Sequence, residues 1–451
     1  MRDRLLRPSQ CEFSCATLLT EARRGFDYII GNPPFIGHNV RSAAQKEDMR
    51  LVFGDTQTDK IDYVACWFRK AADLMQGTAT RTALVATNSI CQGVSVGILW
   101  KQLFDRGFKI DFAWPTFIWN SESTDQAHVH VVVVGFSRKE LPRTPRLLRD
   151  GMATPCDNIN GYLVNAPDIC PGRRSTPLSA VPPIRVGSLP RSSAFTVTAE
   201  ERPLFIADNP LCEKWIKPYI GSDEFINGGE RYCLWLKDAN IHELRSCRMV
   251  MERVEQVRAA RLASPAATTR RAAATPTLFA VDAQPTTPYL LIPQVSSERR
   301  RYIPIGFMTP DIIASNLVFV VPDATLYHFG VLTSNVHMAW MRVVAGRLES
   351  RYRYGGDLVY NNFPWPDLRA SASPRENISS TAQAILDARA RHPDLTFADL
   401  YDPLTMPPDL LKAHQANDRA VMTAYGFDVK MTESDCVAEL FKLYERLTAR
   451  A

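Results

Sequence analysis

The sequence predicts an α/β protein in which an open sheet with covering helices is followed by a β-rich region and a helical C-terminal region. Three observations lead to this fold class. Strand-like and helix-like patterns alternate over the first third of the chain, Gly and Pro become frequent beyond Pro142, and helical periodicity returns from Ser379 onward. A length of 451 residues suggests about three domains, which we place at residues 1–148, 149–367 and 368–451.

The predicted sheet begins with a buried strand at residues 26–31. Its apolar run ends at Gly31, because Asn32-Pro33-Pro34 cannot extend a hydrogen-bonded ladder. Apolar periodicity then predicts helices at residues 59–75 and 98–104. Further strands are predicted at residues 81–87, 109–114 and 128–136. This order of strands and helices predicts a mostly parallel sheet with an antiparallel pair at one edge.

The middle of the chain predicts little regular helix. Short apolar runs suggest strands at residues 289–292, 302–305 and 317–321. The Ala-, Thr- and Pro-rich stretch at residues 259–288 predicts a long loop or insertion. Helices are then predicted in the C-terminal region at residues 382–391, 408–425 and 433–447.

The composition excludes several classes of protein. With 45% hydrophobic and 22% charged residues, neither wholesale disorder nor a coiled-coil or collagen-like chain fits. The ten cysteines include no C-x-x-C pair and no His pair has ligand spacing, which argues against a zinc site and predicts no metal. No apolar stretch approaches the ~20 residues of a membrane span. We therefore expect reduced thiols and a cytoplasmic location.

The segment Asn32-Pro33-Pro34-Phe35 is the most informative one, because it follows the first predicted strand at the edge where open α/β sheets bind ligands. In such a turn the Asn32 side-chain oxygen and the Pro33 carbonyl can both accept hydrogen bonds from one exocyclic amino group. Pro34 would stiffen the turn, and Phe35 would stack on a base that has left the duplex. The alternative is a plain turn that ends a strand, since Asn and Pro favour turns.

The positive charge of the chain is concentrated in its middle. Residues 241–301 contain ten arginines and five acidic residues, and ten minus five equals the whole net charge of +5. The arginine fork can pair with phosphate or with guanine, and a second cluster alternates Arg with Tyr. The alternative for any single arginine is a solvated surface charge. The candidate DNA-contacting residues are Arg299, Arg300, Arg301, Arg347, Arg351, Tyr352 and Arg353. Trp114 and Trp119 are interpreted as core or wall aromatics.

Residues 26–37 (F-D-Y-I-I-G-N-P-P-F-I-G) resemble motif IV of the amino-group DNA methyltransferases, in which N-P-P-F accompanies N6-adenine methylation. Further blocks resemble the MmeI-like enzymes, which are single-chain type IIL restriction–modification methyltransferases. These blocks are residues 62–68, 84–93, 107–114, 219–228, 296–307, 350–354, 360–366 and 400–404.

The resemblance implies a fold and an activity. The fold would be a partial class I, Rossmann-like methyltransferase sheet, followed by a target recognition domain and a small helical domain. The activity would be prokaryotic: transfer of a methyl group from S-adenosylmethionine to a flipped adenine in a specific sequence of double-stranded DNA. Asn32 and Pro33 would then position and activate the adenine amino group, and Trp114 would lie close to the base pocket.

The resemblance also implies parts that this sequence lacks. No G-x-G, the glycine-rich turn that holds the cofactor, occurs in the chain, and only residues 15–19 resemble the block before motif IV. We therefore expect the C-terminal part of such an enzyme, with the first strand as a bare apolar edge that invites a partner. The expected partners are double-stranded DNA and a companion polypeptide that carries the cofactor-binding half. Alone, the chain is expected to bind DNA and to transfer methyl groups poorly or not at all.

Two other hypotheses remain open from the sequence. The chain can be a non-catalytic DNA-binding specificity subunit that retains N-P-P-F through ancestry. It can also be a truncated remnant that does not fold on its own.

Overall fold

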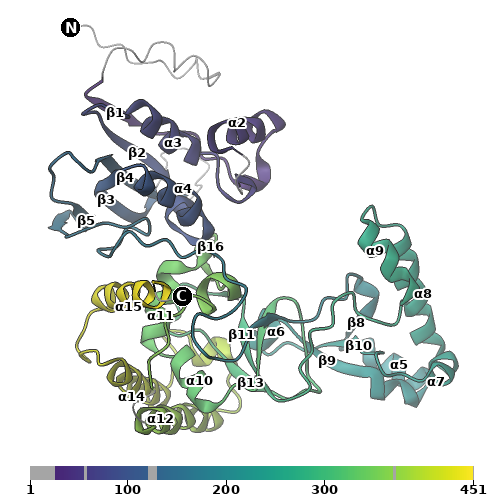
Figure 1. Cartoon of the computed structure of the whole chain (residues 1–451). Coiled ribbons are helices and arrows are strands. Elements are labelled where there is room, and N and C mark those ends of the chain that lie inside the picture. Colours follow the sequence, from purple (N-terminus) through teal and green to yellow (C-terminus); the bar gives the residue numbers. More distant parts are fainter. Residues whose placement is uncertain (1–25, 55–57, 120–128, 369–371, 450–451) are drawn as a thin grey trace. The chain divides into compact units, whose positions relative to one another are not determined.

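The computed structural model describes residues 26–54, 58–119, 129–368 and 372–449 (Figure 1). The expectations for residues 1–24 and for His128 lie outside this part of the chain. The chain divides into two compact units, Met1–Arg173 with Val437–Ala451 and Arg174–Cys436. None of the helices in the described part is long and apolar enough to cross a membrane.

The first unit contains a six-stranded sheet in the order β1-β2-β4-β3-β5-β6. Its strands are β1 (Tyr28–Gly31), β2 (Arg81–Thr87), β3 (Phe108–Trp119), β4 (Val129–Arg138), β5 (Arg146–Arg149) and β6 (Met152–Pro155). The pairs β1–β2 and β3–β5 are parallel, whereas β4 is antiparallel to both of its neighbours, β2 and β3. The prediction of α/β structure is confirmed. The prediction of a mostly parallel sheet with the antiparallel pair at one edge is wrong for the described strands. Strand β4 returns from β3 and inserts between β3 and β2, and three of the five pairs, β2–β4, β3–β4 and β5–β6, are antiparallel.

Aromatic side chains form the core between this sheet and its helices. Phe68 on α3 (Ala65–Leu74) lies 5.7 Å from Trp100 on α4 (Gly93–Asp105) and 5.8 Å from Phe136 on β4, centroid to centroid. All three side chains are at most 1% exposed. Helix α3 begins six residues later than predicted, because residues 58–60 form a separate 3-10 turn.

Helix α2 (Ala43–Phe53) was not predicted from the sequence. It begins with a capping box in which the Ser42 hydroxyl accepts from the Gln45 amide and the Gln45 side chain accepts from the Ser42 amide. A Ser followed three residues later by Gln is a helix-start signal that the sequence does contain.

Strand β1 forms an edge of the sheet, as the sequence predicts. Among the described strands it pairs only with β2, so the other side of its backbone ladder has no described partner. Its side chains Tyr28 and Ile30 are 67% and 79% exposed, and Phe26, just before the strand, is 53% exposed, so the prediction of a buried strand is wrong. An edge of this kind can accept a further strand.

The second unit contains three small sheets, in the orders β14-β9-β10-β8, β13-β11-β15-β7 and β12-β17-β16. Their strands are β7 (Arg185–Val186), β8 (Thr196–Thr198), β9 (Ile216–Ile220), β10 (Arg231–Leu234), β11 (Tyr289–Pro293), β12 (Val295–Ser296), β13 (Gly306–Met308), β14 (Ile313–Ala314), β15 (Val318–Pro322), β16 (Gly346–Leu348) and β17 (Arg351–Arg353). The strands predicted at 289–292 and 317–321 are confirmed as β11 and β15. The strand predicted at 302–305 is wrong: these residues form a buried loop.

Helices occupy part of the region in which little helix and a long loop were predicted. The longest is α8 (Arg248–Leu262), which follows α7 (Ile241–Ser246) and precedes α9 (Ala267–Arg271) (Figure 1). The inner face of α8 carries Val250, Val254, Val257 and Arg261, which are all buried and recur at helical spacing. The buried arginine in the last position obscures this stripe in the sequence.

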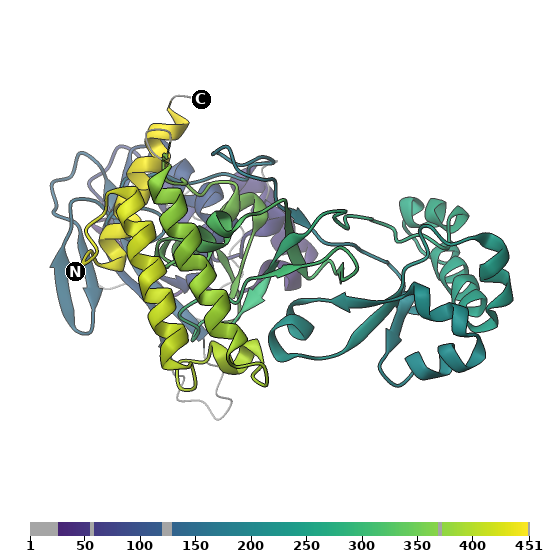
Figure 2. The same ribbon diagram turned by 90° about the horizontal axis from the view of Figure 1, so that it is seen from below.

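The C-terminal part of the chain is helical, as predicted. Its helices are α12 (Ser373–Ala390), α13 (Phe397–Leu400), α14 (Pro408–Tyr425) and α15 (Glu433–Thr448), after α10 (Leu326–Leu332) and α11 (Asn335–Val344). Helices α12 and α14 pack side by side (Figure 2). The bounds of α14 match the prediction, because Pro408 stands at its start and Gly426 ends it with a φ of 72°.

A buried carboxylate joins three parts of the second unit. Asp418 on α14 is 5% exposed and accepts hydrogen bonds from the Tyr302 hydroxyl at 2.6 Å and from the Asn335 amide at 2.8 Å. Burial raises the pKa of Asp418 from 3.8 to about 6, although both hydrogen bonds and the charges of Arg301 and Arg419 oppose the rise.

This shift predicts a pH dependence of stability. The folded protein holds the Asp418 proton more tightly than the unfolded chain does. The stabilisation of the folded state by this tighter proton binding is therefore complete below about pH 3.8, and it is lost as the pH rises through about 6. Between about pH 5 and about pH 7 the free energy of unfolding is expected to fall by about 1 kcal/mol more in the wild type than in Asp418→Asn, which does not titrate. His414, whose pKa burial lowers well below its ordinary value, stays neutral over this range. Urea unfolding at the two pH values measures the difference, and equal changes in both proteins would contradict the prediction.

Candidate functional site

The Asn32-Pro33-Pro34-Phe35 segment leaves the carboxyl end of β1 directly after Gly31. Asn32 and Pro34 are exposed, Pro33 is buried, and Phe35 is half-buried. The two proline rings restrict the backbone of the turn, and the buried Pro33 fixes it to the body of the unit. The Asn32 side chain is therefore presented to solvent from a rigid base.

The residues after this segment are tied to the loop before α3. The Ile36 carbonyl accepts from the Tyr63 amide at 3.0 Å, and the His38 amide donates to the Asp62 carboxylate at 2.8 Å. Arg41, 6% exposed, donates to the Thr58 carbonyl at 2.9 Å. Sequence reasoning did not single out these holding residues, because nothing in the sequence indicates that the two loops meet.

Three strands, β1, β2 and β3, have their carboxyl ends on the side of the sheet that carries this segment. Because β4 is antiparallel to both β2 and β3, strand β3 runs parallel to β2 and to β1. The end of β3 extends past its last pairing with β5, at Ala113, and carries an aromatic row. Phe117 lies 5.3 Å from Trp114 and 6.3 Å from Trp119 between ring centroids.

This aromatic row excludes one part of the expectation, a place in the core, and leaves the other part, a place in a wall. Trp114 and Trp119 were interpreted as core or wall aromatics, but they are 40% and 45% exposed, and β3 continues five residues beyond its predicted end. Their position at the same sheet edge as Asn32 makes them candidate walls of a base pocket. The expectation that Trp114 lies close to that pocket agrees with this edge position.

The candidate DNA-contacting residues of the second unit gather on one small sheet. In the β12-β17-β16 sheet, Arg347 lies opposite Tyr352, while Arg351 lies opposite Leu348. Directly opposed residues share a face of a sheet, and neighbours along a strand point to opposite faces. Arg351 and Arg353 therefore lie together on one face, where both are exposed, and Arg351 also pairs with Glu349 at 2.8 Å.

The other face of this sheet is structural. Tyr352 is 6% exposed, and the Arg347 guanidinium stacks on its ring at 3.9 Å from the centroid. Arg347 also donates to the Ser350 carbonyl at 3.2 Å, which holds the turn between the two strands. Arg347 and Tyr352 thus support the hairpin that presents Arg351 and Arg353.

The arginines at 299–301 lie in the loop that continues from β12. Arg299 and Arg301 are exposed, and Arg300 is half-buried. Because β12 pairs with β17 through Ser296 and Tyr352, the sheet brings the start of this loop next to Arg351. We group the exposed arginines of this loop and of strand β17 under one name, the arginine face: Arg299, Arg301, Arg351 and Arg353.

Most of the other arginines in residues 241–301 have partners within the protein. Arg248 pairs with Glu252 at 2.9 Å, Arg258 pairs with Glu255 at 3.4 Å, and Arg253 pairs with Glu201. Arg261 is 1% exposed and donates to four backbone carbonyls. The concentration of charge in the sequence therefore overstates the charge available to DNA from α8.

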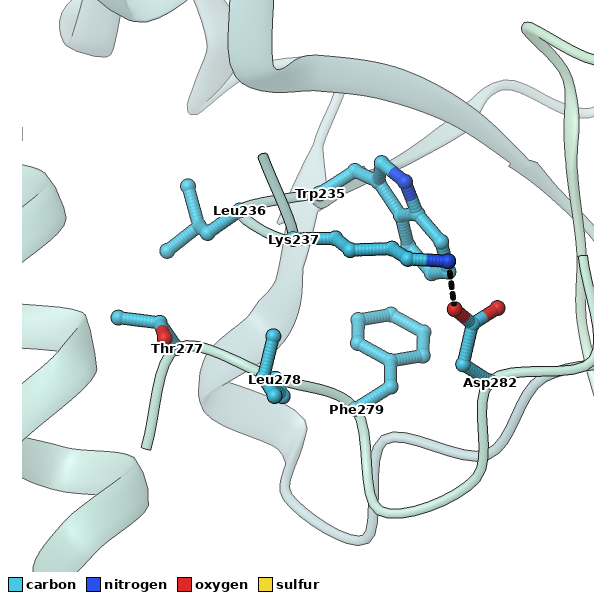
Figure 3. Close-up of a pocket in the computed structure, with 7 residues that line it drawn as sticks. All are labelled: Trp235, Leu236, Lys237, Thr277, Leu278, Phe279 and Asp282. Atoms are coloured by element: carbon cyan, nitrogen blue, oxygen red, sulfur yellow. Dashed lines mark ion pairs between the residues drawn. The ribbon is translucent and has the colours of Figure 1, made fainter. Parts of the chain in front are cut away.

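A small cavity of about 100 Å³ lies elsewhere in the second unit (Figure 3). The rings of Trp235 and Phe279 form one wall at 4.9 Å between centroids, and the Lys237–Asp282 ion pair at 2.6 Å stands at its edge. The cavity contains none of the candidate residues. Sequence reasoning did not single it out.

Comparison with known proteins matches three segments of the chain to three domain models of one family. Family models described as the MmeI DNA-methyltransferase domain, target recognition domain and C-terminal domain match residues 10–148, 165–367 and 370–451. The chain belongs to the MmeI family. A solved structure of the type IIL restriction–modification enzyme MmeI in complex with DNA is 42% identical, with a TM-score of 0.85. This match covers 94% of our chain and 57% of the MmeI chain, and it confirms the predicted methyltransferase, target recognition and C-terminal architecture.

A second relative supports the same assignment. DNA methyltransferase A of Bacillus subtilis (strain 168) is 38% identical over 428 residues, which are 94% of our chain and 48% of the relative. The chain thus spans about half the length of the relatives that it matches.

The described residues of this MmeI-family chain do not make up a complete site for S-adenosylmethionine, the cofactor that methyltransferases generally use. Beside Asn32, strand β1 has an open edge with exposed Tyr28 and Ile30, where a cofactor site would need a neighbouring strand with a glycine-rich turn. The chain has no G-x-G in any position.

Proposed function

We propose that this chain is the base-binding and target-recognition part of a site-specific DNA adenine-N6 methyltransferase from a restriction–modification system. One observation carries the proposal: Asn32-Pro33-Pro34-Phe35 stands at the carboxyl end of β1 in a chain that matches both a DNA-methyltransferase model and a target recognition model. The proposed domains are residues 1–148, 149–367 and 368–451.

In this proposal the adenine amino group is held by two acceptors. The Asn32 side-chain oxygen and the Pro33 carbonyl each accept one N–H, which raises electron density on the amino nitrogen and directs its lone pair toward the incoming methyl group. Pro34 keeps the turn rigid, so that the acceptors are in place before the base arrives. Phe35 stacks on the flipped base. The surplus amino proton leaves to solvent after transfer, so no general base is assigned.

The cofactor half has to come from outside the described residues. The open edge of β1, with 67% of Tyr28 and 79% of Ile30 exposed, supports a parallel strand added there by a segment outside the described residues, in this or in a companion polypeptide. S-adenosylmethionine is the methyl donor that the family implies, and the added segment would supply most of its site.

We expect the 451-residue chain alone to transfer no methyl groups above background. With duplex DNA and S-adenosylmethionine labelled in its methyl group, label should enter DNA only after a companion polypeptide with a glycine-rich cofactor turn is added. Appearance of N6-methyladenine in the digested DNA identifies the product. Robust labelling by the chain alone would show that it needs no second half.

A non-catalytic specificity subunit is the second candidate. The arginine face lies among the described residues of the second unit, whereas the described residues of the first unit do not complete a cofactor site, and this contrast favours the alternative. Tight, salt-dependent binding to a specific duplex without methyl transfer under any pairing would support it. Failure of the chain to express as a folded monomer would instead support a truncated remnant.

The arginine face predicts the salt dependence of DNA binding. Loss of two phosphate contacts lowers the slope of log K against log salt by about 2, so Arg351→Ala with Arg353→Ala should do so and weaken binding about tenfold or more. Fluorescence anisotropy with a labelled duplex at several salt concentrations measures both quantities.

The matched control removes the same charge from α8. Arg248→Ala with Arg258→Ala replaces two arginines that pair with Asp208, Glu252 and Glu255. This double variant should leave the slope unchanged. Equal losses in the two double variants would mean that net charge, rather than the arginine face, binds DNA.

A further inference from the structure

We infer that Asp418 positions the arginine loop, residues 297–305, for DNA binding, so that the C-terminal helices control DNA affinity through a buried residue that does not reach the DNA. The inference rests on the DNA-binding function proposed above. It concerns how the loop is held in the free protein.

The first set of contacts that fixes the loop is at Tyr302, directly after the three arginines. Its side chain is fully buried, its hydroxyl donates to Asp418 at 2.6 Å, and its ring stacks on His414 at 4.1 Å between centroids. Asp418 and His414 lie four residues apart on one face of α14. Helix α14 therefore holds the loop by an ionic hydrogen bond and a ring contact at the same residue.

The Asp418 carboxylate has a second partner that fixes its own position. Its other oxygen accepts from the amide of Asn335, the first residue of α11, at 2.8 Å. A carboxylate at the N-terminus of a helix is stabilised by the unpaired amides and the helix dipole there. Both oxygens of Asp418 are thus used, which leaves it little freedom to move away from Tyr302.

The loop is held at two further backbone positions. The Arg301 carbonyl accepts from Arg342 on α11 at 2.7 Å, and the Ile305 carbonyl accepts from Arg389 on α12 at 2.7 Å. Arg389 also donates to the Tyr401 hydroxyl at 2.8 Å, and this hydroxyl contacts the His414 ring nitrogen at 2.8 Å. The contacts form one buried network behind the loop.

The network determines how much order the loop has before DNA arrives. The Arg299 and Arg301 side chains are exposed, and the Arg301 guanidinium also lies over the Tyr302 ring at 5.5 Å from its centroid, so Tyr302 joins this arginine to the network. A loop that is already ordered loses less conformational entropy on binding than a loose one, and it binds more tightly for that reason. Asp418 has this effect from behind the loop, without touching the ligand.

The experiment separates loop order from DNA binding. Asp418→Asn removes the charge and one of the two acceptor oxygens, and Tyr302→Phe removes the hydroxyl donor, while both keep the shape of the side chain. Trypsin cleavage after Arg299–Arg301 under native conditions reports loop order, and anisotropy with a labelled mixed-sequence duplex reports affinity. Ile378→Val on α12 is the stability control, since Ile378 is fully buried against Gly330 on α10.

We expect Asp418→Asn and Tyr302→Phe to speed cleavage of the loop and to lower DNA affinity about fivefold to tenfold, while Ile378→Val changes neither. A background in which Arg299 and Arg301 are replaced by alanine adds a readout that general destabilisation would not give. In that background Asp418→Asn should cause no further loss of affinity, because its effect acts through these two arginines.

Three results would overturn the inference. Cleavage unchanged by Asp418→Asn would mean that the carboxylate does not hold the loop, whatever happens to DNA binding. Faster cleavage with unchanged affinity would mean that loop order does not matter. An equal affinity loss with and without Arg299 and Arg301 would mean a general structural effect. If the wild type binds no duplex at all, the proposed function fails and the affinity part of the inference fails with it, while the cleavage result still decides whether Asp418 holds the loop.

Discussion

Asn32→Ala is expected to reduce methyl transfer by at least about a hundredfold in the enzyme complemented with its cofactor half. Loss of one positioned hydrogen-bond partner in a preorganised site commonly costs about 10²–10³ in rate. Here the lost group is the side-chain acceptor, which leaves the Pro33 carbonyl to hold the amino group alone. Initial rates of label transfer to duplex DNA measure the effect, together with the affinity for the same duplex.

The matched control is Asn39→Ala. Asn39 is also an exposed asparagine in the same segment, in the 3-10 turn His38–Val40, and it stands seven residues beyond the candidate position. This variant should keep full activity, and both variants should bind DNA as the wild type does, because the arginine face carries binding. An Asn32→Ala enzyme with more than about a tenth of wild-type activity would remove Asn32 from its assigned role.

Arg261→Ala is expected to lower the free energy of unfolding of the second unit by about 3 kcal/mol or more. The Arg261 guanidinium donates to the carbonyls of Ala272 and Thr275 at 2.9 and 3.0 Å, and to those of Pro190 and Leu278 at 3.2 and 2.7 Å. Truncation leaves these buried acceptors without their donor and opens a cavity below α8. Urea unfolding followed by circular dichroism measures the loss.

Arg258→Ala on the same helix is the control for charge. Arg258 is 45% exposed and pairs only loosely with Glu255, at 3.4 Å, so its loss should change stability by less than about 0.5 kcal/mol. Similar unfolding curves for the two variants would show that the four carbonyl contacts of Arg261 contribute little.

Local patterns made part of the fold predictable. Strand β2 was predicted at its observed bounds, Arg81 to Thr87, and in the structure buried and partly buried residues alternate strictly along it. Helix α14 was predicted at its observed bounds because Pro408 and Gly426 mark its ends. The position of β4 between β2 and β3 was not predictable, since a strand pattern carries no record of which neighbours it pairs with.

The candidate sites also combine features that local sequence predicts with features that depend on long-range contacts. The Asn32-Pro33-Pro34-Phe35 turn could be found in the sequence because its chemistry lies in four adjacent residues, and proline restricts its own backbone wherever it stands. Its support by Asp62 and Thr58, and its place on the same sheet edge as Trp114, depend on contacts with residues distant in the chain.

The arginines show what only the tertiary structure decided. The sequence by itself determined that positive charge gathers in the target recognition region, because charge is a property of each side chain. Whether a given arginine meets DNA depends on its burial and partners: Arg261 faces four carbonyls, Arg347 stacks on Tyr352, and the exposed Arg351 and Arg353 share one face, with Arg351 paired to Glu349. These surroundings depend on residues distant in the sequence: Pro190 contacts Arg261, and Asp418 contacts the loop that carries Arg301. Such residues come into contact only in the folded chain.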